Sequence, residues 1–331
     1  MPEGPMHDRQ VLLYFAWSRP GEIGAPLTVI DDRFPAIFEL RRLFYPNFEA
    51  LADPAHVDQG IAGFLDKVQK PNFLAFMEQA QAQTGRQALA AERVADDGST
   101  TALDDALVAG ADTIVVISFD SLRTGQSALP TEIEAVERFL SHPDHLIFVC
   151  PHHDIGEAPG AGTEARLALQ SAEHLHHGDR GIPPRQGFGG FARTLLAGLG
   201  VPIENRFGLR PAVDADGAPA PIEAERSLDD LGLLDGVERF NLHPHLPQLE
   251  RLGDAAARMQ VLARQRIDLS APPHPFVRGG RESFDALLQS SPDTFAGRLL
   301  VCDTTMFSST AGGLDSLRRF WANIVQRPRR S

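Results

Sequence analysis

The chain has 331 residues, 43% of them hydrophobic and 23% charged, which is the composition of a folded globular protein with a large core. Its 31 basic and 44 acidic residues give a net charge of -13, and this acidic balance argues against nucleic acid as a partner. No apolar run reaches the roughly 18 residues that a membrane span needs, and the amino-terminal residues lack the features of a signal peptide. We therefore expect a cytoplasmic protein without a membrane partner.

The residue types that most often mark reactive sites are sparse. The two cysteines, Cys150 and Cys302, lie far apart and each ends an apolar run, which favours reduced thiols over a disulfide framework. Lys67 and Lys70 are the only lysines, and the chain lacks the glycine-rich motif with a lysine that cradles nucleotide phosphates. We expect no nucleotide cofactor.

The first predicted elements are a strand and an N-terminal helical segment. Residues 11–16 (VLLYFA) form a continuous apolar run of the kind found in strands that are covered on both faces. Residues 61–68 carry apolar side chains at i, i+3, i+4 and i+7, which predicts a helix. Because Pro71 interrupts this pattern, we expect a second short helix over 73–77.

Strands and helices alternate from about residue 90 onward. The pattern predicts a short strand near residue 90, a helix over 101–109, a strand over 113–118, a helix over 130–140 and a strand over 146–150. Pro130 fits the first turn of its helix, and Glu132 complements the positive end of the helix dipole. Strands that alternate with helices imply right-handed crossovers and a parallel sheet.

We interpret the whole chain, residues 1–331, as a single α/β domain with two insertions. Residues 151–190 are rich in glycine, proline and histidine and form a long loop insertion with helices expected over 163–172 and 188–199. Residues 204–240 are interpreted as a small hairpin insertion that turns at 214–221, with a strand over 237–242 at its end. A strand over 297–302 and an amphipathic helix from residue 314 close the chain.

The middle of the chain resembles a known superfamily. A strand with the sequence TIVVIS, an amphipathic helix, a strand that ends at Cys150 and a later His243-Pro-His245 are similar to the class I glutamine amidotransferase-like proteins. The C-terminal GRLLVCDTTMF resembles the final strand of degenerate members such as the ThuA-like proteins. The resemblance implies a flavodoxin-like, mostly parallel sheet with helices on both faces, with Cys150 as nucleophile and His243 as base.

The chain departs from that family at both catalytic positions. Pro151 follows the cysteine and has no N–H to donate to an oxyanion. His245 stands where the family has a glutamate that orients the histidine. These departures weaken the prediction of thiol chemistry.

Polar residues follow three apolar runs, where an open parallel sheet forms its ligand crevice. The first is the segment after Cys150, and the second begins at His243. The third is Asp303 with the two threonines that follow it. Eight of the 12 histidines lie between Cys150 and Pro275, and imidazole with carboxylate is the ligand set of zinc, iron and manganese sites. The predicted ligands are His152 or His153, Asp154, His176 or His177, and His243 or His245. We expect only one of the adjacent His152 and His153 to point inward.

A second candidate is an anion site at the start of the helix expected over 188–199. Gly189 lies at that start, where backbone N–H groups face outward, and Arg180 and Arg185 are near in sequence. We predict these three residues as candidates for binding an anionic cofactor or substrate group.

These patterns predict a hydrolase or lyase that acts on a small polar molecule with the help of a divalent metal. The ion would activate a water or polarise a carbonyl, and His153, Asp154 or His243 would move the proton. One alternative is a cysteine hydrolase that uses Cys150 and His243. Another is a domain of the same fold that only binds a ligand or partner, and a homo-oligomer is an open alternative in either case.

Overall fold

The computed structural model describes residues 9–23, 70–158, 160–179, 185, 187–309 and 314–329. The strands are β1 (Val11–Ser18), β2 (Leu89–Val94), β3 (Thr113–Ser118), β4 (Leu146–Pro151), β5 (Ile203–Leu209), β6 (Glu223–Ala224), β7 (Leu246–Arg251), β8 (Met259–Arg266), β9 (Ser283–Ser290) and β10 (Arg298–Cys302). The α-helices are α1 (Arg19–Ile23), α7 (Lys70–Thr84), α8 (Asp105–Val108), α9 (Pro130–Leu140), α10 (Thr163–His177), α11 (Gly190–Gly198), α12 (Ala255–Arg258) and α13 (Leu314–Gln326).

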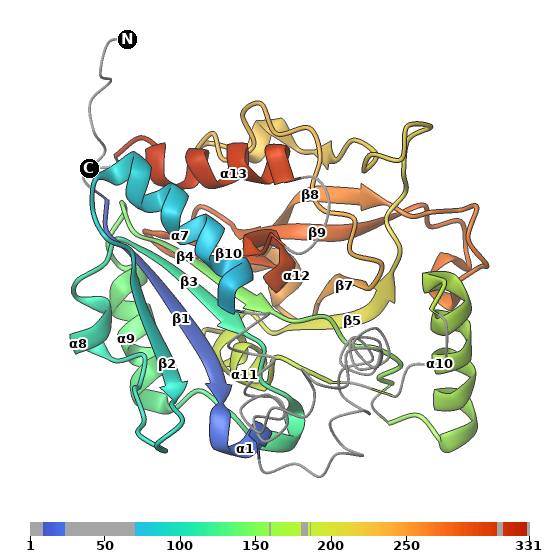
Figure 1. Ribbon diagram of the computed structural model, residues 1–331, viewed down its shortest axis with the longest axis horizontal. Coiled ribbons are helices and arrows are strands. Elements are labelled where there is room, and N and C mark those ends of the chain that lie inside the picture. Colours follow the sequence, from blue (N-terminus) through green and yellow to red (C-terminus); the bar gives the residue numbers. More distant parts are fainter. Residues whose placement is uncertain are drawn as a thin grey trace, which may run out of the picture.

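A mixed sheet of eight strands in the order β2-β1-β3-β4-β10-β9-β8-β6 forms the centre of the fold (Figure 1). Its first five strands are mutually parallel, whereas β9, β8 and β6 continue the sheet in antiparallel pairing. Strands β5 and β7 pair with each other in a separate antiparallel sheet. The predicted α/β class and parallel strands are confirmed, but the sheet as a whole is mixed.

Helices cover both faces of the parallel part, because alternate residues of its strands are apolar on both sides. Leu13 and Phe15 of β1 face the cluster that includes side chains of α7 and α13. Leu12 and Tyr14 face the opposite cluster, which includes side chains of α8, α9 and α11. Figure 1 shows α7 and α13 on one side of the sheet and α9 and α11 on the other.

Several predicted elements differ in length or kind. The helix around Pro71 begins at Lys70 and runs to Thr84, because a proline in the first turn costs no hydrogen bond. The helix predicted over 163–172 extends to His177, and the one over 101–109 is a single turn. Residues 237–242 form no strand: Val237 and Phe240 are buried as anchors of an irregular segment. The helix predicted over 61–68 lies outside the described residues.

The expected hairpin insertion over 204–240 is rearranged. The turn at 214–221 is present, with Val213 bridged to Pro219, but β5 pairs across the insertion with β7. The sequence pattern also did not predict β7, β8 or β9, whose strands mix apolar and polar residues.

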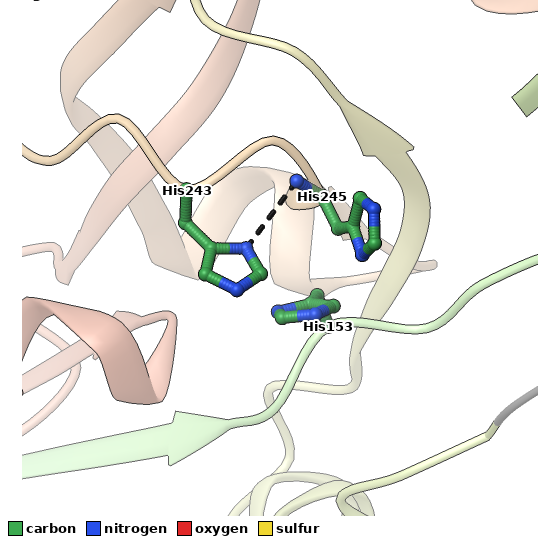
Figure 2. A group of neighbouring side chains, drawn as sticks. All are labelled: His153, His243 and His245. Atoms are coloured by element: carbon green, nitrogen blue, oxygen red, sulfur yellow. Dashed lines mark hydrogen bonds between the residues drawn. The ribbon is translucent and has the colours of Figure 1, made fainter. Parts of the chain in front are cut away.

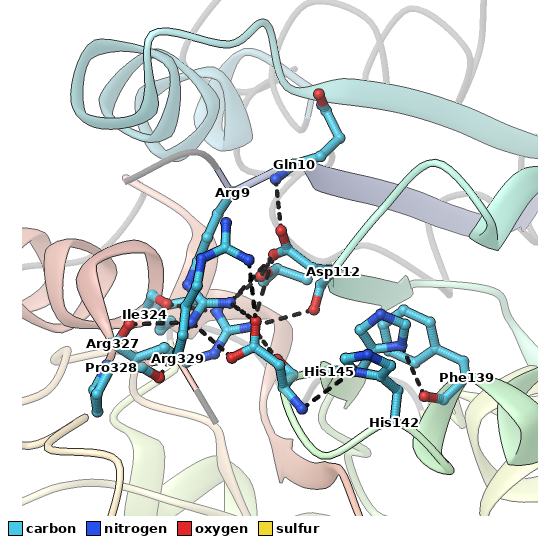
Figure 3. Close-up of polar contacts among 12 residues, drawn as sticks. Arg9, Gln10, Asp112, Phe139, His142, His145, Ile324, Arg327, Pro328 and Arg329 are labelled. Atoms are coloured by element: carbon cyan, nitrogen blue, oxygen red, sulfur yellow. Dashed lines mark hydrogen bonds and ion pairs between the residues drawn. The ribbon is translucent and has the colours of Figure 1, made fainter. Parts of the chain in front are cut away.

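Arginines join the two termini at the amino ends of the parallel strands (Figure 3). Arg9 donates to both carboxylate oxygens of Asp144, at 3.0 and 3.1 Å, and to the carbonyl of Arg327. Arg327 donates to Thr113 Oγ1 at 2.8 Å and to the Asp112 and Asp144 carbonyls. We call Arg9, Asp144 and Arg327 the terminal clamp. Within the described part of the chain, no helix is long and apolar enough to cross a membrane.

Candidate functional site

The candidate site begins where two adjacent parallel strands end. His152 and His153 follow β4, and Asp303 follows β10. Since β4 and β10 pair in parallel, their carboxyl ends lie at the same edge of the sheet. The ligand atoms of these three residues come within 4.8 Å of one another, and we call them the strand-end group. Both histidines belong to it, so the prediction that only one points inward is wrong: beyond Pro151 the chain leaves the extended strand and its alternation.

A second group comes from the end of α10. Gly178 adopts a left-handed conformation with φ of 75° and caps this helix, so that the chain turns sharply between His177 and Asp179. His245 precedes β7 and its Nε2 lies 3.0 Å from Asp179 Oδ1. We call His177, Asp179 and His245 the helix-end group; their ligand atoms also lie within 4.8 Å of one another.

The two groups meet at a central triad of His153, His243 and His245 (Figure 2). The ring of His153 lies 4.5 Å from that of His243 and 5.6 Å from that of His245, measured between centroids. Figure 2 shows His153 approaching from the segment after β4, and the other two from the segment that leads into β7. The backbone N–H of His245 donates to His243 Nδ1 at 3.3 Å.

Four buried polar atoms of the two groups have no hydrogen-bond partner among the described residues. They are His153 Nδ1 and Asp303 Oδ2 in the strand-end group, and His177 Nδ1 and Asp179 Oδ2 in the helix-end group. A buried polar atom without a partner costs about 1–3 kcal/mol, so such atoms require an explanation. Their gathering in one place is the feature that distinguishes this site.

Burial favours the neutral form of three imidazoles at the end of β4 and before β7. It lowers the pKa of His152, His153 and His243 well below the ordinary value, and the neighbouring imidazoles lower it further. Burial likewise raises the pKa of the Asp303 carboxyl. Burial would also raise the pKa of Asp179, but the facing imidazoles of His177 and His245 outweigh it and hold the pKa below its ordinary value. Neutral imidazoles with carboxylates are the state in which these side chains bind a metal ion.

Hydrogen bonds orient the side chains of the site. Asp303 Oδ1 accepts from the Thr305 hydroxyl at 2.6 Å, and that hydroxyl accepts from the Asn241 amide at 3.0 Å. Asn241 Oδ1 in turn accepts from the His243 backbone N–H at 3.0 Å. His177 Nε2 bonds to the Gly208 carbonyl, which fixes the proton on Nε2 and leaves Nδ1 with its lone pair. These bonds hold Asp303, His243 and His177 in place.

The structure places Asp154 and His176, both predicted as ligands, outside these groups. The Asp154 carboxylate accepts from the Phe188 N–H at 2.8 Å and pairs with Arg193, so it ties the segment after β4 to α11. His176 uses both ring nitrogens for backbone contacts, with Pro272 O at 2.9 Å and the Arg210 N–H at 3.0 Å. Neither has a ligand atom to spare.

Cys150 lies in the sheet and not at the site's surface. Its side chain is fully buried, with Sγ 3.7 Å from Sγ of Cys302 on the neighbouring strand. Burial raises the pKa of the Cys150 thiol well above the ordinary value, which works against formation of a thiolate nucleophile.

Of the residues predicted to bind an anion, Gly189 has a packing role in the structure. The start of α11 already has its own anion, because Asp120 Oδ2 accepts from the Phe191 N–H at 2.9 Å and Ser118 Oγ from the Ala192 N–H at 3.0 Å. Gly189 has φ of 77°, and a side chain there would meet Pro151, so the glycine is needed for packing. Arg185 is exposed, and Arg180 lies outside the described residues.

The predicted set of ligands did not include Asp179 or Asp303, although Asp179 belongs to the His- and Asp-rich segment and both residues fell in segments expected to line the crevice. The signal for Asp303 was its place directly after a core strand. The signal for Asp179 was weaker, because only the turn at Gly178 brings it back beside His177. Neither a scan against protein-family models nor a search of curated proteins finds a match to this chain.

Proposed function

We propose that the protein is a metal-assisted hydrolase or lyase for a small polar molecule, with its centre in the strand-end group, the helix-end group and His243. The fold supports the proposal, because the five parallel strands follow the flavodoxin-like order 2-1-3-4-5 and the histidines lie beyond their carboxyl ends. We propose a resemblance to the class I glutamine amidotransferase-like proteins in fold only. The observation that carries the function is the set of four buried ligand atoms that lack hydrogen-bond partners and face one another in two pairs, 3.5 and 3.4 Å apart.

A divalent ion would satisfy those atoms and supply the chemistry. Zinc, iron and manganese all accept imidazole and carboxylate ligands, and each can lower the pKa of a bound water or polarise a carbonyl. The centre is not sealed: the side chain of Asp179 is 21% exposed and that of His245 is 12% exposed. A small substrate could therefore reach an ion held there. The buried Cys150 gives the thiol alternative no comparable support.

The test is metal content and its dependence on the shared ligands. His153 and His245 together take part in all three candidate groups, so the double variant H153A/H245A removes a ligand from each. We expect wild-type protein without a His tag to bind zinc, iron or manganese in elemental analysis, and the double variant to bind none. The metal-loaded wild type, but not the chelator-treated protein, should hydrolyse members of a panel of small esters, amides and phosphate esters.

The exposed His142, at the opposite end of β4, provides a matched control, since H142A removes a histidine without touching the site. It should keep the metal content of wild type. Equal metal content in wild type and H153A/H245A, or no metal in wild type after incubation with each ion, would overturn the proposal.

A further inference from the structure

We infer that the centre holds two divalent cations, one in the strand-end group and one in the helix-end group, with His243 between them as an unligated hydrogen-bond donor. This inference rests on the proposed function and adds the number of ions and the separate role of His243. The two groups share no residue, and each consists of two histidines and one aspartate. Two histidines and a carboxylate form a recurrent three-ligand set for divalent first-row metals, with positions left open for substrate or water.

In both groups, a histidine Nδ1 and an aspartate Oδ2 that lack hydrogen-bond partners face each other at nearly the same distance. His153 Nδ1 lies 3.5 Å from Asp303 Oδ2, and His177 Nδ1 lies 3.4 Å from Asp179 Oδ2. Both pairs stand at ion-pair distance without a well-directed hydrogen bond. Two ligands of one tetrahedral ion with bonds of about 2.0–2.1 Å stand roughly 3.4 Å apart, along the edge of the tetrahedron. Each pair therefore has the spacing of two ligands that share an ion.

The proton position of His177 agrees with this assignment, whereas an ion bound through His245 Nε2 would replace the 3.0 Å hydrogen bond from that nitrogen to Asp179 Oδ1. His177 donates from Nε2 to the Gly208 carbonyl, so its Nδ1 carries the lone pair that an ion needs. His152 Nδ1 lies 2.9 Å from the Thr304 hydroxyl, a contact that fixes its ring at the end of β4. Such bonds to the second nitrogen are the usual way in which a protein orients a metal-binding imidazole.

His243 has the opposite arrangement. Its Nδ1 accepts the backbone N–H of His245, so in the neutral ring the proton resides on Nε2. That nitrogen is then a donor and not a ligand. Its ring lies beside His153 of one group and 5.4 Å from the ring of His245 of the other, measured between centroids. A hydrogen-bond donor in that place would stabilise negative charge that develops on a substrate oxygen, and the two ions would supply Lewis-acid activation of a water or carbonyl.

The test compares metal stoichiometry among single variants. Metal-free protein is titrated with Mn²⁺, and bound ions are counted by elemental analysis after gel filtration. We expect two ions per chain in wild type and in H142A, one in H153A, one in H177A and two in H243A. H243A should nonetheless lose at least tenfold in turnover of whichever substrate the panel identifies. Circular dichroism identifies any variant that fails to fold, and H153Q and H177Q then replace the alanine variants.

A spectroscopic measurement on wild type avoids mutation altogether. Two Mn²⁺ ions held close together are spin-coupled, so the fully loaded protein should give a multiline electron paramagnetic resonance signal that half loading weakens. One ion per chain, lost in H243A, would overturn the inference in favour of a single ion in the central triad and would leave the proposed function standing. No bound ion in wild type would overturn both.

Discussion

At the scale of single residues, Asp120 is an unusual group outside the candidate site. Its carboxylate is fully buried and accepts from the Phe191 N–H at the start of α11 and from the Ser118 hydroxyl. Burial raises the pKa of Asp120 to about 6, although these hydrogen bonds oppose the shift. The folded protein therefore binds a proton at Asp120 more tightly than the unfolded chain does, for which the ordinary value is 3.8.

This difference predicts how stability changes with pH. Unfolding releases the proton of Asp120 between pH 3.8 and about 6, so its contribution favours the fold at low pH and is lost as pH rises through that window. A shift of about two pKa units corresponds to about 3 kcal/mol. In D120N, which has no proton to lose, the free energy of unfolding relative to wild type should rise by up to that amount between pH 4 and pH 7.

Urea unfolding at intervals of one pH unit measures the difference. The exposed Asp216 on a surface turn offers a control, because D216N removes a carboxyl group without touching the buried network. Its free energy of unfolding should follow that of wild type across the same range. A constant difference between D120N and wild type from pH 4 to pH 7 would show that Asp120 titrates alike in both states.

At the scale of elements, α9 shows how one side chain joins three segments. Glu132 is fully buried, and its carboxylate accepts from the Leu129 N–H ahead of the helix and from the Leu103 N–H ahead of α8, both at 2.8 Å. It also pairs with Arg93 of β2. The carboxylate thereby satisfies backbone donors that the ends of the two helices would otherwise leave unpaired.

Loss of this carboxylate should destabilise the fold strongly. We expect E132A to lower the free energy of unfolding by about 3–5 kcal/mol, because it leaves the Arg93 guanidinium buried without its partner. E134A lies on the exposed face of the same helix, where the carboxylate stands 3.8 Å from Arg138, and it should cost no more than about 0.5 kcal/mol. Chemical denaturation of both variants makes the comparison; equal losses would contradict the role of Glu132.

The elements also show where sequence patterns succeed. The strands over 113–118 and 146–150 and the helix over 130–140 are predictable because each has one burial pattern along its whole length. In contrast, β9 (SFDALLQS) carries Asp285 and Gln289 among its apolar residues. Arg264 of β8 and Gln248 of β7 donate to Asp285, and Gln289 donates to the Leu228 carbonyl. Such a strand has no period of its own, since distant segments decide which side chains are covered.

The candidate site follows the same division. The places after β4 and β10, and the histidines of the segment before β7, could be expected to meet from the rule that ligands lie beyond strand ends. The sequence could not predict which of these side chains come together, because that depends on the partners that each side chain finds in the fold. Asp154 is occupied by Arg193, His176 by two backbone groups, and Asp179 is returned to the site by Gly178.

At the scale of the whole molecule, the amino ends and the carboxyl ends of the parallel strands differ in role. The terminal clamp lies at the amino ends of the strands, where Arg9 precedes β1, Asp144 precedes β4 and Arg327 follows α13. The candidate site occupies the carboxyl edge. Since the sheet separates the two, stability and metal binding should respond to different substitutions.

Arg327 provides the test of that separation. Its guanidinium is buried and makes four hydrogen bonds, to Thr113 Oγ1 and to the carbonyls of Asp112, Asp144 and Ile324. We expect R327A to lower the free energy of unfolding by about 3–5 kcal/mol and R327K to recover little of it, because an ammonium cannot reproduce the planar fork. R329A, in a side chain that is 60% exposed, should cost no more than about 0.5 kcal/mol.

Metal content shows whether R327A affects only the terminal clamp or also the candidate site. At a temperature where circular dichroism shows R327A to be folded, it should bind as many Mn²⁺ ions as wild type, because no ligand of the candidate site contacts the clamp among the described residues. H153A and H177A should show the reverse, with ions lost while the unfolding of the metal-free protein changes by less than that of R327A. Loss of metal from folded R327A would instead mean that the clamp sets the positions of the strand ends through the whole length of β4.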